Sequence, residues 1–270
     1  MLPKTSSDLI RKQMMDVLSK VYNNKNEYIR VILELVSDIY DPLEDESDQP
    51  DLRVQETRLQ TCLSMVLELL EKTSKDLSHS GIRDVFQNLI TPSLTSISAT
   101  VRRDGFKCLG LYCLLDKEKV NQKMPIFLRG LQIETDEQIL LTIVRNVVDI
   151  LLIFGVAVVA DQGKEDSLIA TLREFLKHEN QEIRMAAVEG FCKLFFTATI
   201  HDANILMDLV EEFLNPLTER FIKIRKCLQE FFTRYVRTMI VLFVRFLTKQ
   251  HLTWQICSVQ SSQPRFSRAS

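Results

Sequence analysis

Six basic side chains recur near equivalent points of similar helical stretches, and they are the residues of this sequence best placed to bind a charged partner. These residues are Arg102, Arg103, Arg184, Lys223, Arg225 and Lys226. Cations repeated along a surface attract the phosphates of DNA or the carboxylates of an acidic protein. Each cation can instead pair with an acid or a carbonyl group of the adjoining repeat, because a partly buried Arg needs partners. We favour this internal ladder and keep contact with DNA or a partner as the candidate role.

No set of residues in this sequence has the spacing of a catalytic or metal-binding site. The four His are scattered, at positions 79, 178, 201 and 251, and none shows the HExxH spacing of metal ligands. Motifs that bind nucleotide phosphates or expose a nucleophilic Ser are missing. The six Cys form no CxxC pair and fall mostly on apolar helical stripes, which is typical of reduced core thiols in a cytosolic or nuclear protein. The sequence therefore predicts no enzyme activity, no cofactor, no metal and no small-molecule substrate.

The elements that carry the six cations are amphipathic helices that recur at a regular interval. Four such helices begin at Val101, Ile139, Ile183 and Ile224, so the steps between them are 38, 44 and 41 residues. This interval matches the roughly 40–47 residues of a HEAT or armadillo helix pair. In the stretch 182–196, the small residues Ala186, Ala187 and Gly190 lie on the apolar stripe and would let a neighbouring helix approach closely. The predicted fold is all-α, an α-solenoid of HEAT-type helical repeats.

Apolar periodicity places helices along most of the chain. They are predicted at residues 7–21, 27–39, 56–72, 81–90, from 101, 119–131, 139–154, 167–176, 182–196, 203–214 and from about 221. The first carries its apolar residues on one side, namely Leu9, Ile10, Met14, Val17, Leu18 and Val21. Thr91-Pro92 is expected to stop the helix before it, and Gly155 fits the position just past a helix end.

The chain divides by composition into four parts. Residues 1–40 form a first helix pair of the array, and residues 41–55 form an acidic linker with two prolines. Residues 56–235 form the repeat domain, and residues 236–270 form a divergent helix with a disordered tail.

The net charge of −2 divides into −10 before Glu219 and +8 from there on. Solvation of helix faces explains this asymmetry more simply than a binding surface does. Charges interrupt the longest apolar runs, so no membrane span is expected.

Several blocks, in order, resemble the C-terminal HEAT region of the CAP-G subunit family of condensin. The blocks are Ser37–Leu43, Cys108–Leu111, Phe127–Ile133, Ala187–Phe196, Ile205-Leu206, Asn215–Glu219, and Ile224 to Tyr235. The resemblance covers about residues 7–235. Two departures stand out: Met1 falls inside the family's repeat array, and the sequence after Tyr235 is unlike the family. We therefore expect a partial array in which the loss of end-capping repeats exposes an apolar helix face and lowers solubility.

The resemblance implies a non-catalytic condensin scaffold. Such a subunit binds the kleisin subunit (CAP-H type) and, through it, the SMC ATPase subunits. With the kleisin it holds double-stranded DNA during mitotic chromosome condensation, and it is found in the nucleus and on mitotic chromosomes, with a cytoplasmic pool. The alternative is a HEAT adaptor outside condensin, of the phosphatase-scaffold or transport-factor type. This alternative predicts protein binding with little salt-dependent affinity for DNA.

Overall fold

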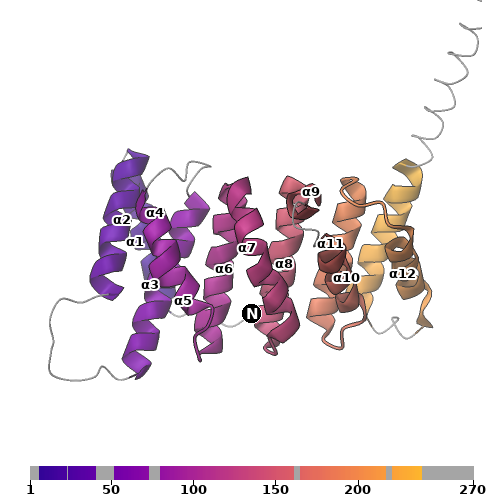
Figure 1. Cartoon of the computed structure of the whole chain (residues 1–270), viewed down its shortest axis with the longest axis horizontal. Helices are drawn as coiled ribbons and strands as arrows, with labels where there is room; N and C mark the ends of the chain where they lie inside the picture. The colour runs from indigo at the N-terminus through magenta and orange to yellow at the C-terminus, as the bar shows by residue number, and fades with distance from the viewer. Residues whose placement is uncertain are drawn as a thin grey trace, which may run out of the picture. The chain divides into compact units, whose positions relative to one another are not determined.

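The computed structural model describes residues 6–22, 24–40, 52–72, 80–160, 165–216 and 221–238. These residues form helices and short connections, with no strand among them (Figure 1). The chain divides into two compact units, Met1–Ile205 and Leu206–Ser270. The predicted acidic linker lies mostly outside the described residues, as does the predicted tail after residue 238. The predicted boundaries of the four parts stay predictions.

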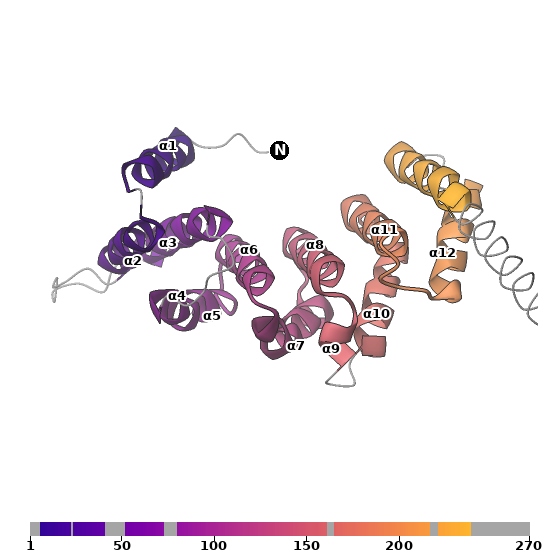
Figure 2. The same cartoon turned by 90° about the horizontal axis from the view of Figure 1, so that it is seen from above.

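The first unit is built from helices in two rows. Its elements are α1 (Ser6–Val21), α2 (Lys25–Tyr40), α3 (Leu52–Lys72), α4 (Ser80–Val85), the π-helical turn Phe86–Ile90, α5 (Thr91–Ser93), α6 (Ala99–Leu115), α7 (Lys117–Ile133), α8 (Glu137–Phe154), α9 (Ala157–Ala160), α10 (Glu165–Glu174), the 3-10 turn Phe175–Lys177 and α11 (Gln181–Phe196). In the first row α3 packs on α6, α6 on α8 and α8 on α11, while α4–α5, α7 and α10 form a second row behind it (Figure 2). This stacking of helix pairs confirms the predicted all-α solenoid.

Small residues set the spacing of the first row. A Cβ atom built on Gly190 of α11 would lie 2.5 Å from Cγ2 of Val148 on α8, so the two backbones approach as closely as glycine allows. Gly110 of α6 faces Asn146 of α8 in the same way. The Asn146 amide fills that space and donates a 2.8 Å hydrogen bond to the Phe106 carbonyl oxygen. The role predicted for the small residues of 182–196 is therefore confirmed at Gly190.

Most predicted helices are confirmed, with starts that fall two to four residues earlier in several cases. Asp116, Asp136 and Asn180 act as N-caps of α7, α8 and α11, each accepting a backbone N–H two residues on. These caps explain why α7 and α8 begin two residues before the predicted starts and α11 one residue before it, because apolar periodicity does not register a polar first turn. Gly155 ends α8 with φ +77°, as predicted.

One predicted helix end is wrong. The helix expected to stop at Thr91-Pro92 continues through both residues to Ser93. Phe86–Ile90 forms a π-helical turn, and its Phe86 carbonyl accepts hydrogen bonds from the Thr91 N–H and from the Thr91 hydroxyl at 3.0 Å. Pro92 falls at the start of the short α5 that follows the π turn, and a missing N–H costs least in the first turn of a helix.

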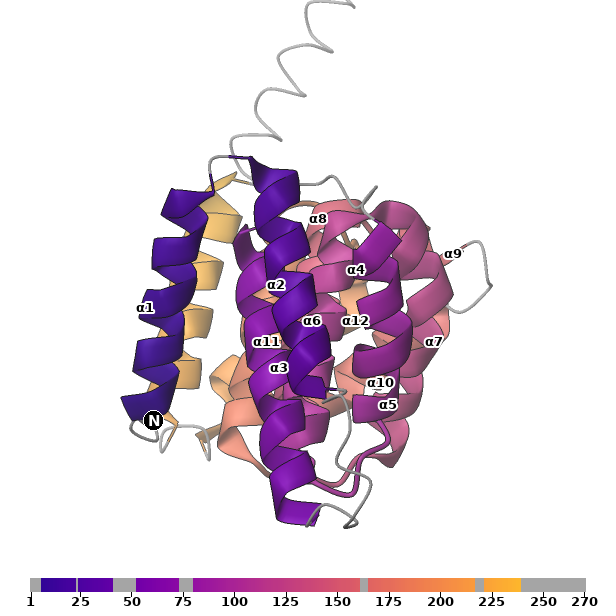
Figure 3. The same cartoon turned by 90° about the vertical axis from the view of Figure 1, so that its left-hand side faces the viewer.

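α1 shows a different buried side from the one its periodicity indicates. Met15 is fully buried against the unit, and Asp16 forms a 2.5 Å ion pair with Lys72 of α3. Most of the predicted apolar side is exposed instead, by 50–64% at Leu9, Ile10, Met14, Val17 and Val21. Figure 3 shows α1 standing beside α2 and α3. The predicted effect of an exposed apolar helix face on solubility stays a prediction.

The second unit contains the part of α12 (Ala203–Leu214) from Leu206 onward and a helix over residues 222–238. Phe213 contacts Phe232 with ring centroids 5.5 Å apart, and Phe231 stacks on Tyr235 at 5.0 Å. This aromatic contact confirms the predicted pairing of these two helices. No helix of the described residues is both long enough and apolar enough to cross a membrane.

The Gly190–Val148 contact gives a direct test of the stacking. Gly190→Ala should lower the free energy of unfolding by about 1–3 kcal/mol, because the added methyl group overpacks the interface between α8 and α11. Combining it with Val148→Ala should cost less than the sum of the two single changes. The measurement is chemical denaturation followed by circular dichroism.

Glu189→Ala is the matched control for this test. Its side chain is 48% exposed beside Gly190 and pairs with Lys193 four residues on, so the change should stay within about 0.5 kcal/mol. Equal stability of wild type and Gly190→Ala would contradict the close approach of the two helices.

Candidate binding groove

A polar groove lies where α1 faces the first row of helices. It has a volume of about 530 Å³, and its walls come from α1, α3 and the first half of α6. The lining residues are Arg11, Lys12, Thr57, Gln60, Thr61, Ser64, Leu67, Glu68, Glu71, Thr100, Arg103, Asp104 and Lys107. Helices far apart in sequence therefore present one continuous polar surface.

Hydroxyl groups line the α3 wall of the groove. The hydroxyls of Thr57, Thr61 and Ser64 each donate a 2.8 Å hydrogen bond to a carbonyl oxygen one turn earlier in α3. Since each proton is already used, the hydroxyl oxygens can still accept hydrogen bonds. This wall is therefore suited to backbone N–H groups or other donors of a bound chain.

The α6 wall carries linked charges. Asp104 accepts from Lys107 at 2.7 Å and from Arg103 Nε at 3.2 Å, so one carboxylate holds two cations. With Arg11 and Lys12 of α1, and with Glu68 and Glu71 of α3, the described lining contains four cations and three carboxylates. A groove of mixed charge with one excess cation fits a peptide that carries both signs better than it fits a continuous row of phosphates.

Arg102 lies outside this groove and is bonded within the unit. Its guanidinium binds both carboxylate oxygens of Glu134, at 3.0 and 3.1 Å, and donates to the carbonyl oxygens of Ser96 and Ile97 at 2.9 Å. Burial raises the pKa of Glu134, but the bonds from Arg102 and from two backbone N–H groups lower it by more. These contacts pair Arg102 with an acid and with carbonyl groups inside the repeat array, which is the role favoured for the six cations. Its candidate role in binding stays a prediction.

Similar polar links join neighbouring first-row helices at the same ends. Glu56 of α3 accepts from Ser98 and Thr100 at the start of α6. Asn180, the N-cap of α11, donates a 2.5 Å hydrogen bond to Glu137 in the first turn of α8. Between them, Arg102 and Glu134 link the start of α6 to the connection that leads from α7 into α8.

The structure separates the other predicted cations. Arg103 lines the groove, and Arg184 is half-buried on α11 with contacts of its own. Lys223 and Lys226 are exposed and Arg225 is half-buried, all three on the helix 222–238 of the second unit. Contact of these residues with DNA or a partner stays a prediction.

Sequence analysis did not single out the other cations of the groove. Lys107 could have been found from its spacing, four residues after Arg103 on one helix face. Arg11 and Lys12 could not, because only the packing of α1 on α3 brings them to the groove.

The cysteines behave as core residues. Cys62, Cys108, Cys113 and Cys192 are buried free thiols, and Cys108 Sγ donates to the Leu63 carbonyl oxygen at 3.4 Å. Burial raises the pKa of Cys62 to about 11 and that of Cys113 to about 12. Such thiols stay protonated and are poor nucleophiles. Within the described part of the chain, no three His, Cys, Asp or Glu side chains are grouped to hold a metal ion.

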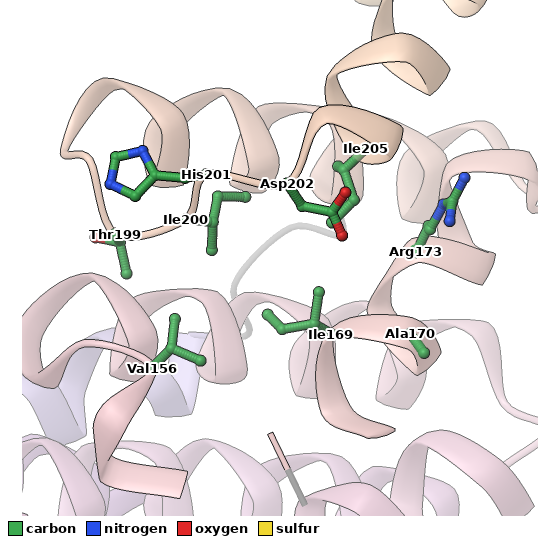
Figure 4. A pocket seen from close by; sticks show the side chains of 9 residues that line it. All are labelled: Val156, Ile169, Ala170, Arg173, Thr199, Ile200, His201, Asp202 and Ile205. Carbon is green, nitrogen blue, oxygen red and sulfur yellow. The ribbon is translucent and has the colours of Figure 1, made fainter. Parts of the chain in front are cut away.

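A second hollow of about 420 Å³ lies between α10 and the turn that leads into α12 (Figure 4). Val156, Ile169 and Ile205 form its apolar side. His201 and Asp202 lie at separate points of its rim. The Asp202 carboxylate accepts the Asn204 N–H at 2.7 Å, so it caps the following helix. This arrangement supplies no pair of groups for acid–base chemistry.

The stacked helix pairs define the class of the protein by its fold, a helical-repeat protein. The model of the family described as nuclear condensing complex subunits, C-terminal domain, matches residues 61–241. The chain therefore belongs to this family.

Curated relatives agree with the family. Condensin complex subunit 3 of Xenopus laevis is 26% identical over 233 residues, which cover 70% of this chain and 22% of the relative. The subunit 3 of Saccharomyces cerevisiae is 30% identical over 173 residues, covering 62% and 16%. The chain spans about a fifth of the length of these relatives.

A solved structure shares the fold. The crystal structure of the Schizosaccharomyces pombe condensin Cnd3–Cnd2 subcomplex matches with a TM-score of 0.71 and 24% identity, over 83% of this chain and 30% of that chain.

The link between Arg102 and Glu134 should make stability depend on pH. Glu134→Gln should lower the free energy of unfolding by about 1–3 kcal/mol at pH 7, because it removes a charge-assisted pair. The pKa of Glu134 is depressed in the folded state, so its contribution is present above the ordinary value of 4.5 and is lost as pH falls below it. Wild type and variant should therefore converge in acid. Urea unfolding across a pH series measures this difference.

Glu34→Gln is the control for the pH series. Glu34 pairs with Arg30 at 3.7 Å, and both side chains are more than 60% exposed, so its loss should have little effect at any pH. A stability difference for Glu134→Gln that stays constant down to pH 3 would rule out the ionised pair as its source.

Proposed function

We propose that this chain is a non-catalytic HEAT scaffold of condensin, of the CAP-G type, that binds the kleisin subunit (CAP-H type). Through the kleisin it joins the SMC ATPase subunits, to which ATP hydrolysis belongs. The observation that carries the proposal is the polar groove on α1, α3 and α6 within a repeat fold of the condensin family. In this proposal the protein works in the nucleus and on mitotic chromosomes, with a cytoplasmic pool.

The chemistry of the groove supports an extended peptide as its occupant. The hydroxyl oxygens of α3 accept from peptide N–H groups, and the paired charges of α6 offer both signs to polar side chains. An extended chain leaves its backbone groups unpaired, so it needs such donors and acceptors along its length.

We further propose that the chain contributes to the binding of double-stranded DNA during chromosome condensation. Lys223 and Lys226 support this role because they are exposed on one helix and Arg225 lies between them. Phosphate contacts by such residues would add affinity without sequence preference.

Kleisin binding is tested by co-expressing the 270-residue chain with a tagged kleisin and measuring its recovery. Arg103→Glu combined with Lys107→Glu should lower recovery at least about ten-fold, because both cations of the α6 wall are reversed. Lys177→Glu, an exposed cation after α10, should leave recovery unchanged. Full recovery of the double variant, with an unchanged circular dichroism spectrum, would exclude this groove as the kleisin site.

DNA binding is tested by fluorescence anisotropy with a labelled DNA duplex across a salt series. Affinity should fall steeply as salt rises, and Lys223→Ala with Lys226→Ala should reduce the slope of log K against log salt by about 1 for each phosphate that is no longer neutralised. If the wild-type chain binds DNA negligibly or without salt dependence, and is also not recovered with the kleisin, a HEAT adaptor outside condensin would be favoured. The three carboxylates in the groove would suit such a protein partner as well.

A further inference from the structure

A separate pocket of about 490 Å³ lies at the other end of α6 from the groove. It is formed by α4, by the turn between α6 and α7, and by the end of α8. The lining residues are Ile82, Arg83, Tyr112, Leu114, Leu115, Asp116, Lys117, Glu118, Lys119 and Phe154. None of them belongs to the groove or to the six predicted contact residues.

Tyr112 supplies an unused hydrogen-bonding group to this pocket. Its side chain is only 3% exposed, and among the described residues no group forms a hydrogen bond with its hydroxyl. The ring is held in place, since it stacks on Phe86 with centroids 4.4 Å apart. Burial raises the pKa of Tyr112, so the hydroxyl keeps its proton at neutral pH. The hydroxyl can therefore bond to water or to a ligand in the pocket.

The remaining walls combine apolar surface with positive charge. Ile82, Leu115 and Phe154 provide apolar side chains, while Arg83, Lys117 and Lys119 add three cations to the lining. The lining also contains two acids, Asp116 and Glu118. Asp116 is occupied as the N-cap of α7, where its carboxylate accepts the Glu118 N–H at 2.9 Å. Both acids lie at the start of α7, where the helix dipole offsets negative charge.

We propose that this pocket binds an acidic linear peptide segment of a partner protein. One apolar side chain of the segment fills the space beside Leu115 and Phe154. A carboxylate that follows it accepts a hydrogen bond from the Tyr112 hydroxyl and pairs with the cations of the lining. This site goes beyond the kleisin groove and does not depend on it.

Two features favour a peptide over a nucleic acid. A sugar–phosphate chain carries one charge per nucleotide and would meet the carboxylates of Asp116 and Glu118, whereas a peptide carries few acids and can pair them with Arg83, Lys117 or Lys119. The apolar wall also fits an aliphatic or aromatic side chain, and Phe86 already covers one face of the Tyr112 ring, which leaves less aromatic surface for a base to stack on.

The experiment uses the full chain and fluorescein-labelled peptides in which one Leu or Phe is followed by three Glu. The same peptides with Gln in place of Glu, and a labelled oligothymidine, serve as comparison probes. Anisotropy should show saturable binding of the Glu peptides and at least about ten-fold weaker binding of the Gln peptides.

Variants locate the site. Tyr112→Phe should weaken binding of the Glu peptides about ten-fold while the melting temperature stays unchanged, because stacking on Phe86 is retained and no hydrogen bond within the described residues is removed. Lys117→Glu with Lys119→Glu should weaken binding at least as much. Arg129→Glu, which reverses an exposed cation further along α7, should have no effect.

Three outcomes would overturn the proposal. They are equal binding of the Glu and Gln peptides, affinity that does not change in Tyr112→Phe, and binding of oligothymidine with the same dependence on Tyr112. Arg103→Glu with Lys107→Glu should leave peptide binding intact, so failure of the kleisin interaction and failure of this site are separately visible.

Discussion

The close approach of helices in the first row is the constraint on which the rest of the first unit depends. α8 lies between α6 and α11, and its packing is fixed on one side by Gly110 against Asn146 and on the other by Gly190 against Val148. Because these contacts leave no room for a larger side chain, they set the distances between helices more narrowly than apolar burial alone. The groove on α3 and α6, and the pocket at the end of α6, inherit their shapes from this spacing.

Periodicity was enough to predict the solenoid, because each repeat helix shows its buried stripe locally. It failed where the deciding interaction is not local. The proline at position 92 is tolerated because it falls at the start of the short helix after a π turn, and no apolar pattern reveals that turn. The apolar residues of α1 share one side of the helix in the sequence, yet Met15 and the ion pair of Asp16 with Lys72 determine which side is buried. The partner in that pair is 56 residues away.

The candidate sites show the same division between local and distant information. A stretch such as 99–115 indicates that cations lie near the start of a helix and aromatic residues further along. It does not indicate that the start of this helix faces α1 and α3, or that its end faces α4 and α8. α6 therefore contributes to two unlike surfaces: a groove of mixed charge from its first half, and from its end a pocket that combines apolar side chains, charges and the Tyr112 hydroxyl. These surfaces share a helix but no lining residue.

Arg102 and Arg103 explain why counting basic residues is a weak guide to binding surfaces. Adjacent residues of an α-helix point about 100° apart, so two neighbouring cations reach different surroundings. The Arg102 guanidinium bonds to the Glu134 carboxylate and to the carbonyl oxygens of Ser96 and Ile97, whereas Arg103 lines the groove. To bind a phosphate, Arg102 would have to break its two hydrogen bonds to the Glu134 carboxylate. The free-energy cost of breaking them would cancel much of the free energy gained from the phosphate contact. Arg102 instead ties the start of α6 to the connection between α7 and α8, and Arg103 is the one of the two that lines the groove.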